Sequence, residues 1–260
     1  MILLRKEAGS GPAAFKCTPL NYLPPQSGGH ELSVKHFTPR LERLNQNLHA
    51  ILNGSDMGLL RAITTGPEVW RCDYYMISLA FDGTNIWVVN SGDKTVTKLR
   101  ASDGKNLGTF PVGTSPDGVA FDGANIWVVN NYDNTVTKLR ASDGKTLGTF
   151  NVGNSPWEVA FDGSNIWVTN TADNTVSKLR ASDGTVLGTF TVAASEPRSL
   201  AFDGANIWVA NFISNNVTEL RASDGKVLGT FNVGINPNAV AFDGANIWVA
   251  NSISNTVSKL

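Results

Sequence analysis

Cysteine is scarce in this chain, and its scarcity argues against two kinds of structure. The 260 residues contain only Cys17 and Cys72, which lie far apart in the sequence. Disulfide frameworks and cysteine-based metal sites both need more cysteines at short spacings. We therefore expect two unpaired thiols, with a single pairing between them as the alternative.

A charge surplus and long apolar runs are missing as well. The formal net charge is −1 at pH 7, whereas a nucleic-acid partner requires a clustered basic surface. No segment approaches the ~20 consecutive apolar residues of a membrane-spanning helix. The opening MILLRKEAGSGPAAF has too short an apolar run for a secretory signal peptide. The sequence thus predicts no nucleic-acid partner, no membrane span and no visible export signal.

Histidine is absent from the larger part of the chain. His30, His36 and His49 all lie within the first 65 residues. No Ser-His-Asp set, phosphate-binding loop or zinc motif is present. We therefore predict no catalytic residue, no metal site and no cofactor.

The chain instead contains one phrase of ten residues that occurs five times. FDGANIWVVN and its close variants start at intervals of 40, 40, 41 and 40 residues, at Phe81, Phe121, Phe161, Phe202 and Phe242. A period near 40 residues is typical of repeat architectures. We assign residues 66–260 to the repeats and residues 1–65 to a separate, non-repeating segment.

The second copy predicts four short strands. Residues 119–121 form a short apolar run, and residues 126–129 are four consecutive apolar residues of the β-branched and aromatic kinds. Residues 135–140 alternate in polarity, and residues 147–152 form a fourth extended segment. Turn sequences rich in Asp, Asn and Gly separate the four segments.

A sheet with two apolar faces is not stable by itself, so successive sheets must stack and bury each other. The sequence therefore predicts an all-β protein, a β-propeller of about five four-stranded blades. One tryptophan occupies the same place in every blade, and we expect it to pack between neighbouring blades. These tryptophans are Trp87, Trp127, Trp167, Trp208 and Trp248.

The ends of the repeat region suggest how the ring closes. The fifth copy stops at Leu260 after its third strand. By the 40-residue offset, residues 69–72 fall where residues 109–112 stand in the outer strand of the first copy. We hypothesise that residues 67–72 pair with residues 256–260 and close a five-bladed ring. The alternative is that the chain is a piece of a larger propeller.

The non-repeating segment is expected to be loose, with one amphipathic helix. Thr38-Pro39 is a helix start signal, and Gly54 is a stop signal. Between them, apolar residues form one face, at Leu41, Leu44, Leu48, Ile51 and Leu52. We place this helix at residues 39–53.

The repeat string xNIWVxNxxxNTVxKLRASDGxxLGTFxVGxxPxxV resembles the YVTN and NHL propeller repeats of bacterial and archaeal proteins. The resemblance covers residues 67–260 and implies a propeller fold, whereas proteins with such repeats serve in surface layers, in binding and in catalysis. It also implies a periplasmic or extracellular location. Streptogramin lyase-like propellers have similar tryptophan-containing repeats and use a histidine base, which the repeats of this chain lack.

The connecting loops fall into two sets, one on each side of the predicted ring. Loops between strands one and two, and between strands three and four, are nearly invariant among the copies. Loops between strands two and three, and between blades, vary freely. The variable loops carry large side chains that a turn does not require, and we predict a binding site at Tyr132, Trp157, Glu158, Arg198, Phe212 and Ile213. Neutral drift of exposed loops is the alternative.

Three further sets of charged residues recur with the repeat. Asp82, Asp122 and their equivalents precede glycine, so we expect them to form turns. Asp93, Asp133 and Asp173 lie in variable loops, where a cation site is the less favoured interpretation. One strand position carries lysine in four copies, and we expect an exposed row that deters edge pairing, at Lys98, Lys138, Lys178 and Lys259.

The sequence therefore predicts a non-catalytic scaffold that binds a protein or a glycan through its variable loop face. One alternative is a lyase or hydrolase acting at the central channel. The other is a structural module of a surface layer or an adhesion protein. The oligomeric state is left open.

Overall fold

The structure is a computed structural model that describes residues 78–192 and 194–260, together with the backbone of two short strands, β1 (Thr18–Pro19) and β2 (Trp70–Arg71). The described residues contain strands and turns and no helix, and with them no helix long and apolar enough to span a membrane. The predicted helix at residues 39–53 and the rest of segment 1–65 lie outside the described residues, apart from β1.

Five antiparallel sheets follow one another along the chain. The first comprises β3 (Leu79–Phe81), β4 (Asn85–Asn90), β5 (Thr95–Arg100) and β6 (Asn106–Pro111). The second comprises β7 (Pro116–Phe121), β8 (Asn125–Asn130), β9 (Thr135–Arg140) and β10 (Thr146–Asn151). The third comprises β11 (Pro156–Phe161), β12 (Asn165–Asn170), β13 (Thr175–Arg180) and β14 (Val186–Thr191). The fourth comprises β15 (Pro197–Phe202), β16 (Asn206–Asn211), β17 (Asn216–Arg221) and β18 (Val227–Asn232). The fifth has three strands, β19 (Pro237–Phe242), β20 (Ile247–Asn251) and β21 (Thr256–Lys259).

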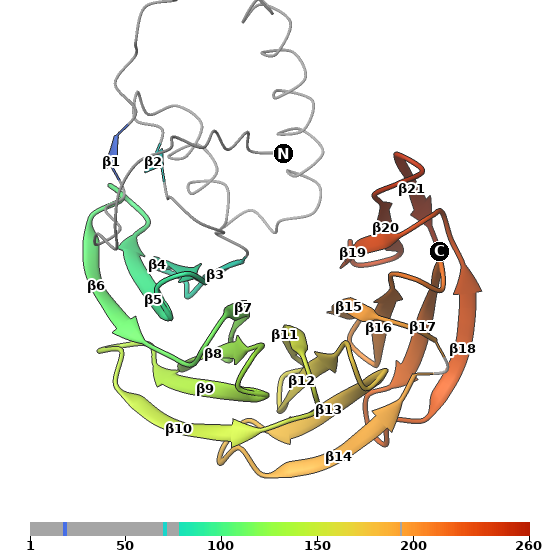
Figure 1. The fold of residues 1–260 in the computed structure, drawn as a ribbon, viewed down its shortest axis with the longest axis horizontal. Helices are drawn as coiled ribbons and strands as arrows, with labels where there is room; N and C mark the ends of the chain where they lie inside the picture. Colours follow the sequence, from blue (N-terminus) through green and yellow to red (C-terminus); the bar gives the residue numbers. More distant parts are fainter. Residues whose placement is uncertain (1–17, 20–69, 72–77, 193) are drawn as a thin grey trace, which may run out of the picture.

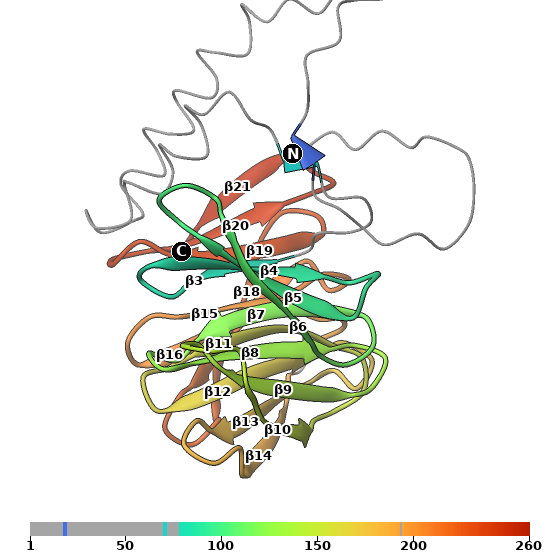
Figure 2. The same cartoon turned by 90° about the vertical axis from the view of Figure 1, so that its left-hand side faces the viewer.

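The sheets stand side by side around an arc, as the blades of a propeller do (Figure 1). Strands β3, β7, β11, β15 and β19 line its inner side, and β6, β10, β14 and β18 lie on its outer side. Packing joins each sheet to the next, mostly through the inner strands. The side view shows the strands of successive sheets layered over one another (Figure 2). The predicted propeller fold is therefore confirmed, with the first and fifth sheets at the two ends of the arc.

The aspartate of each FDG turn holds its hairpin together. Asp162 accepts hydrogen bonds from the backbone N–H of Ser164 at 2.8 Å, from that of Asn165 at 2.6 Å and from Trp167 Nε1 at 2.7 Å. Burial favours a raised pKa for Asp162, but the hydrogen bonds from Trp167 and Asn165 outweigh it and lower the pKa. The other four sheets repeat the bond from the indole, so the predicted turn role is confirmed.

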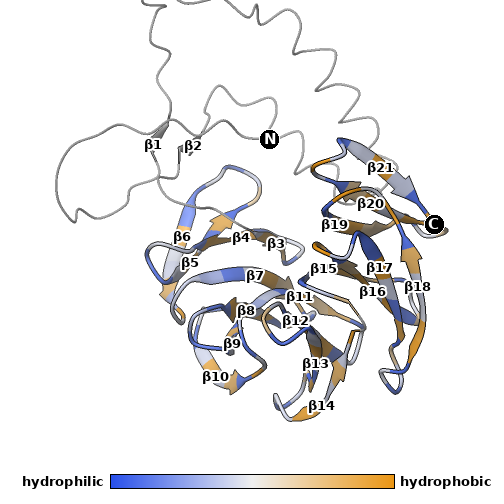
Figure 3. Ribbon diagram, turned by 45° about the vertical axis from the view of Figure 1, so that its right-hand side comes forward, coloured by the Kyte–Doolittle hydropathy of each residue, from blue (hydrophilic) through white to orange (hydrophobic). Residues whose placement is uncertain are grey.

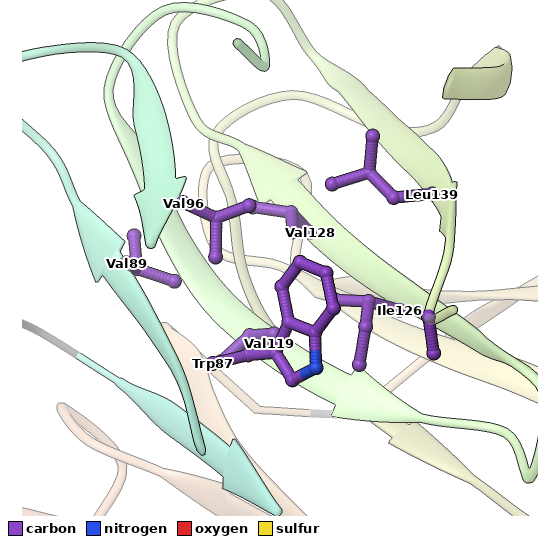
Figure 4. Packing of buried hydrophobic residues seen from close by; sticks show 8 residues of the cluster. Trp87, Val89, Val96, Val119, Ile126, Val128 and Leu139 are labelled. Atoms are coloured by element: carbon purple, nitrogen blue, oxygen red, sulfur yellow. The ribbon is translucent and has the colours of Figure 1, made fainter. Parts of the chain in front are cut away.

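The core lies between the sheets. On one side of the first junction are Trp87, Val89 and Val96 of the first sheet, and on the other are Ile126 and Leu139, among others, of the second (Figure 4). The next two junctions repeat this arrangement around Trp127 and Trp167. Those three tryptophans are fully buried, which confirms their predicted place between blades. The hydropathy colouring agrees, with hydrophobic segments in β8 and β20 (Figure 3).

The prediction of an exposed lysine row is wrong for three of its four members. Lys98, Lys138 and Lys178 are buried. The ammonium group of Lys138 lies 5.1 Å from the centre of the Trp127 ring. It donates hydrogen bonds to the carbonyl oxygens of Ala181 at 2.7 Å and Ser182 at 3.1 Å, in the next sheet. The ammonium group can be buried there because the face of the Trp127 ring and the two carbonyl oxygens make the favourable contacts that water would otherwise make.

The predicted pairing of residues 67–72 with residues 256–260 is not the one that the structure gives to Trp70 and Arg71. These two residues, as β2, pair with β1 instead. In the fifth sheet β21 pairs with β20 alone among the described strands. The other residues of segment 67–72 lie outside the described residues.

Candidate functional site

Hydrogen bonds between the loops define the two sides of the arc. On one side, the loop between strands two and three of a sheet bonds to the loop that precedes the same sheet, as in Asn131 N–H to Ser115 O at 2.9 Å. On the other side, the two remaining loops of a sheet are joined, as in Ala141 N–H to Ala124 O at 3.0 Å. The predicted division into a variable and an invariant side is therefore confirmed.

Each inner strand from β7 onward begins at the variable side with a β-bulge. In β7, Pro116 pairs with Asn130 and Val119 pairs with Val128. The two residues between them on β7 therefore lie opposite a single residue of β8. The inner strands β11, β15 and β19 have register shifts at the same place. Bulges re-aim side chains and are frequent beside functional sites. The bulged residues differ in every copy and read Asp117-Gly118, Trp157-Glu158, Arg198-Ser199 and Asn238-Ala239.

Four of these side chains and one loop residue form what we call the bulge cluster: Asp117, Trp157, Glu158, Arg198 and Phe212. Its centre is the guanidinium of Arg198, whose carbon lies 3.3 Å from the centre of the Phe212 ring and 5.3 Å from that of the Trp157 ring. The same guanidinium pairs with Glu196 at 3.2 Å and donates to Asn238 Oδ1 at 3.3 Å. Arg198 Nε is buried and has no hydrogen-bond partner among the described residues.

A buried threonine fixes the spacing between β11 and β15. Thr169 stands on β12 where the other copies have valine or alanine. Its hydroxyl accepts a hydrogen bond from Glu158 N–H at 3.0 Å and donates one to Arg198 O at 2.8 Å. Because one side chain holds both bulges, Trp157 and Arg198 are positioned by the fold before any ligand arrives.

Two carboxyl groups stand next to this stack. The pKa of Glu158 is raised to about 7, chiefly because the carboxyl group is buried. The hydrogen bond from Val159 N–H lowers this pKa, and the negative charge of Asp117 raises it. Burial raises the pKa of Asp117 to about 6. A Cβ at Gly118 would lie 2.8 Å from Glu158 Oε1, so the absence of a side chain there makes room for the carboxyl group. Near neutral pH the cluster can therefore hold or release a proton.

The predicted site residues divide into two groups. Trp157, Arg198 and Phe212 are in contact, and Glu158 follows Trp157 in the same bulge. Tyr132 and Ile213 are 76% and 54% exposed in their turns. We predicted Trp157, Glu158 and Arg198 in loops, but they lie within β11 and β15, since the inner strands begin at their proline.

Sequence reasoning missed Asp117, Thr169 and Asn238. A signal exists for Thr169, which breaks the repeat between residues that are identical in the other copies, whereas Asp117 and Asn238 lie in a pair of positions that differs in every copy. Asp117 and Asn238 were overlooked because the inner strand was expected to begin two or three residues after its proline. Thr169 differs from valine by a hydroxyl alone, which a hydropathy pattern does not detect.

The loop aspartates serve the backbone. Asp133 Oδ2 accepts from Thr114 N–H at 2.6 Å, and Asp173 Oδ2 accepts from Asn154 N–H at 2.7 Å. Among the described residues no group of three or more metal-ligating side chains converges. The less favoured interpretation of these aspartates as a cation site thus finds no support in residues 78–192 and 194–260.

Comparison with known proteins supports the fold. No family model matches the sequence, and no curated protein sequence matches it. Among solved structures, virginiamycin B lyase from Staphylococcus aureus, in a catalytically inactive form with quinupristin, is similar at a TM-score of 0.63 and 16% identity. That match covers 74% of this chain and 70% of the lyase chain.

Two other solved structures are similar to the same degree. A streptogramin B lyase gives a TM-score of 0.56 at 19% identity, over 67% of this chain and 64% of that one. Hydrazine synthase of Kuenenia stuttgartiensis gives 0.62 at 20% identity, over 67% of this chain. The match spans 55% of the hydrazine synthase chain. At such identities the likeness shows the β-propeller fold alone.

Proposed function

We propose that the chain is a binding scaffold, and that the bulge cluster binds a protein or glycan segment at the variable side of the propeller. The observation that carries the proposal is Arg198, whose guanidinium lies over the rings of both Trp157 and Phe212 and whose buried Nε lacks a partner among the described residues. Stacked arginine and tryptophan are typical of interface hot spots. The repeat itself requires none of these side chains, since the other copies fold with different residues there.

The cluster also defines the chemistry of the ligand. A stacked guanidinium donates N–H groups in a fixed plane, which suits hydroxyl, carbonyl or carboxylate oxygens. The exposed Tyr132 and Ile213 extend the surface along the same side. A peptide loop or a sugar chain offers oxygens of this kind together with apolar area.

Glycan and protein arrays probed with the full chain test the proposal. For a ligand found in this way, Trp157→Ala and Phe212→Ala should each weaken binding about tenfold, because hot-spot truncation removes buried aromatic area. Leu147→Ala, on the outer strand β10, is the matched control and should leave the affinity unchanged. Affinity unaffected by both cluster variants would indicate neutral drift of these residues. Self-association through other surfaces would favour a structural module instead.

The two carboxyl groups favour acid–base catalysis as a second candidate. Glu158 and Asp117 have pKa values of about 7 and about 6 at the inner side of the arc, where a lyase or hydrolase would act. The similarity to two lyases of streptogramin-type compounds makes quinupristin the first substrate to test. Loss of intact quinupristin with the wild type, and no loss with Glu158→Gln, would establish this candidate. No loss with either protein would exclude this substrate.

A further inference from the structure

The bulge cluster has a basic half and an acidic half, one toward each neighbour of β11. Strand β11 carries Trp157 and packs between β7 and β15 (Figure 1). Arg198 of β15 lies over the Trp157 ring, and its charge is balanced by the ion pair with Glu196. Toward β7 lie two carboxyl groups, those of Asp117 and Glu158, which we call the acidic half. No cation among residues 78–192 and 194–260 forms an ion pair with either of them.

Both carboxyl groups of the acidic half are short of partners. Asp117 is 3% exposed, and burial raises its pKa to about 6 with no cation or hydrogen bond among the described residues to lower it. Glu158 accepts a hydrogen bond from Val159 N–H at 3.1 Å. A buried carboxylate is costly unless a cation or several donors pair with it. A cation supplied by a ligand would remove this cost for both groups at once.

The same chain shows three times how it binds a cation beside a tryptophan. At each of the first three junctions, a lysine ammonium lies 5.0–5.3 Å from the centre of a tryptophan ring. It donates to two carbonyl oxygens of the next sheet. The acidic half again combines a tryptophan, Trp157, with two groups that offer oxygen atoms. These groups are carboxyls, and an ionised acceptor makes a stronger hydrogen bond to an ammonium than a carbonyl does.

The depth of Asp117 decides which cation can reach it. A lysine carries its ammonium on a flexible four-carbon stem, and such a stem packs along apolar surface. Trp157 is only partly buried and offers that surface. The amino group of an amino sugar is attached directly to a ring, which is too wide to follow the ammonium to a carboxyl group that is 3% exposed. A calcium ion needs more oxygen ligands than two carboxyl groups supply.

We infer that the acidic half of the bulge cluster binds the ammonium group of a lysine side chain from a protein partner, which donates to Asp117 and Glu158 while its stem packs on Trp157. The inference rests on the proposed binding function and narrows it, because the ligand is then a protein segment with an accessible lysine and not a glycan. A segment that places its lysine there also lies beside Arg198, so one ligand contacts both halves of the cluster.

Selection from a random peptide library tests the inference. Phage-displayed dodecapeptides are selected on the full chain at about pH 8, where both carboxyl groups are mostly ionised. The enriched peptides are labelled and titrated in a fluorescence anisotropy assay, and those that Trp157→Ala weakens bind at the cluster. These peptides should contain a lysine. Its replacement by methionine keeps the stem but removes the charge, and it should weaken binding about tenfold or more.

Protein variants locate the lysine. Asp117→Asn and Glu158→Gln keep the shape of the side chain and remove its charge, so each should weaken binding about tenfold or more. Both variants should melt no lower than the wild type at about pH 8, because each loses a buried carboxylate without a counter-ion. Loss of binding is thereby separated from loss of the fold. Asp143→Asn is the matched control, at an exposed aspartate on the invariant side of the same sheet as Asp117, and should bind as the wild type does.

The outcomes separate the lysine from the binding function as such. Peptides that depend on Trp157 but bind equally well without a lysine, or equally well to Asp117→Asn, would overturn the inference and leave the proposed function standing. Competition by chitosan, a polymer of amino sugars, would overturn it in favour of an amino-sugar ligand. If no enriched peptide depends on Trp157, both the inference and a protein ligand for the cluster are excluded.

Discussion

Asp162 shows how much of a blade depends on one side chain. Its carboxylate accepts from two backbone N–H groups and from the buried indole of Trp167. Removing it leaves these donors without a partner inside the sheet, and an unsatisfied buried donor costs more than a hydrogen bond contributes. The same residue therefore shapes the turn and places the tryptophan.

Asp162→Ala should lower the free energy of unfolding by about 1–3 kcal/mol, measured by urea denaturation. Asp183→Ala is the control within the same sheet. Asp183 pairs with Arg180 at 2.9 Å and accepts from Thr185 N–H at 2.9 Å, and both contacts lie at the surface, so its loss should change stability much less. Equal losses in the two variants would contradict the role assigned to Asp162.

Glu158 makes a separate prediction about pH. Its pKa in the folded chain is about 7, above the 4.5 of an ordinary glutamate. An acid whose pKa is raised by folding binds its proton more tightly when folded, so stability falls as the pH rises from 4.5 to 7. In Glu158→Gln this fall should be smaller, and the variant should be about 2 kcal/mol more stable than the wild type at pH 8. Thermal melts between pH 4 and 8 provide the measurement, and parallel curves would contradict the prediction.

At the scale of the strand, the buried lysines tie each sheet to the next. Lys98, Lys138 and Lys178 donate to the turn carbonyls of the following sheet, whereas Glu219 takes this place in the fourth sheet. Glu219 instead accepts from Asn206 within its own sheet, at 2.8 Å. The tie is therefore present at three junctions and absent at the fourth.

Replacing Lys138 with methionine keeps its packing on Trp127 but removes the donor to Ala181 and Ser182. Lys138→Met should lower the free energy of unfolding by about 1–3 kcal/mol because two carbonyls lose a charged partner. Lys259→Met is the matched control, since Lys259 is exposed and bonds to no carbonyl among the described residues. The control should stay within about 0.5 kcal/mol of the wild type in urea denaturation. A similar loss of stability in both variants would contradict the conclusion that the hydrogen bonds of Lys138 stabilise the contact between sheets.

The strands were predictable where the repeat is strict, and the bulges were not. Strand β9 has the expected bounds, because Thr135–Arg140 alternates and is flanked by turn residues. Strand β7 begins at Pro116, ahead of the expected residue 119. Proline and glycine indicated a loop there, yet proline fits the first position of a strand and glycine fits a bulge. The bulge cluster was therefore only partly visible, since its geometry depends on contacts between sheets.

For the whole molecule, the contribution of a side chain to stability depends on whether a neighbouring sheet buries it. Val136 and Val257 occupy the same repeat position and are 0% and 65% exposed. Val136→Ala should cost about 2 kcal/mol through the cavity that it leaves, whereas Val257→Ala should cost less than about 0.5 kcal/mol. Calorimetric melts of both variants check this, and equal shifts would show that the fifth sheet is covered in solution.

The number of sheets and their stacking could be read from the 40-residue period, because apolar inner strands must be buried on both faces. The pairing of Trp70 and Arg71 with β1 could not, since these residues lie outside the strict repeat. The buried lysines were misjudged for a related reason. A polar residue in an alternating strand indicates solvent, and only the stacked neighbour reveals a π face and two carbonyls.

The near-identity of the first three junctions has a consequence for how the chain reaches its fold. A tryptophan face that fits the next sheet fits the sheet after it almost equally well, because Ile126, Ile166 and Ile207 occupy the same place in their sheets. Surface recognition alone therefore does not fix the order of the blades. That order must be enforced by the short linkers, which bring the correct neighbour into contact first.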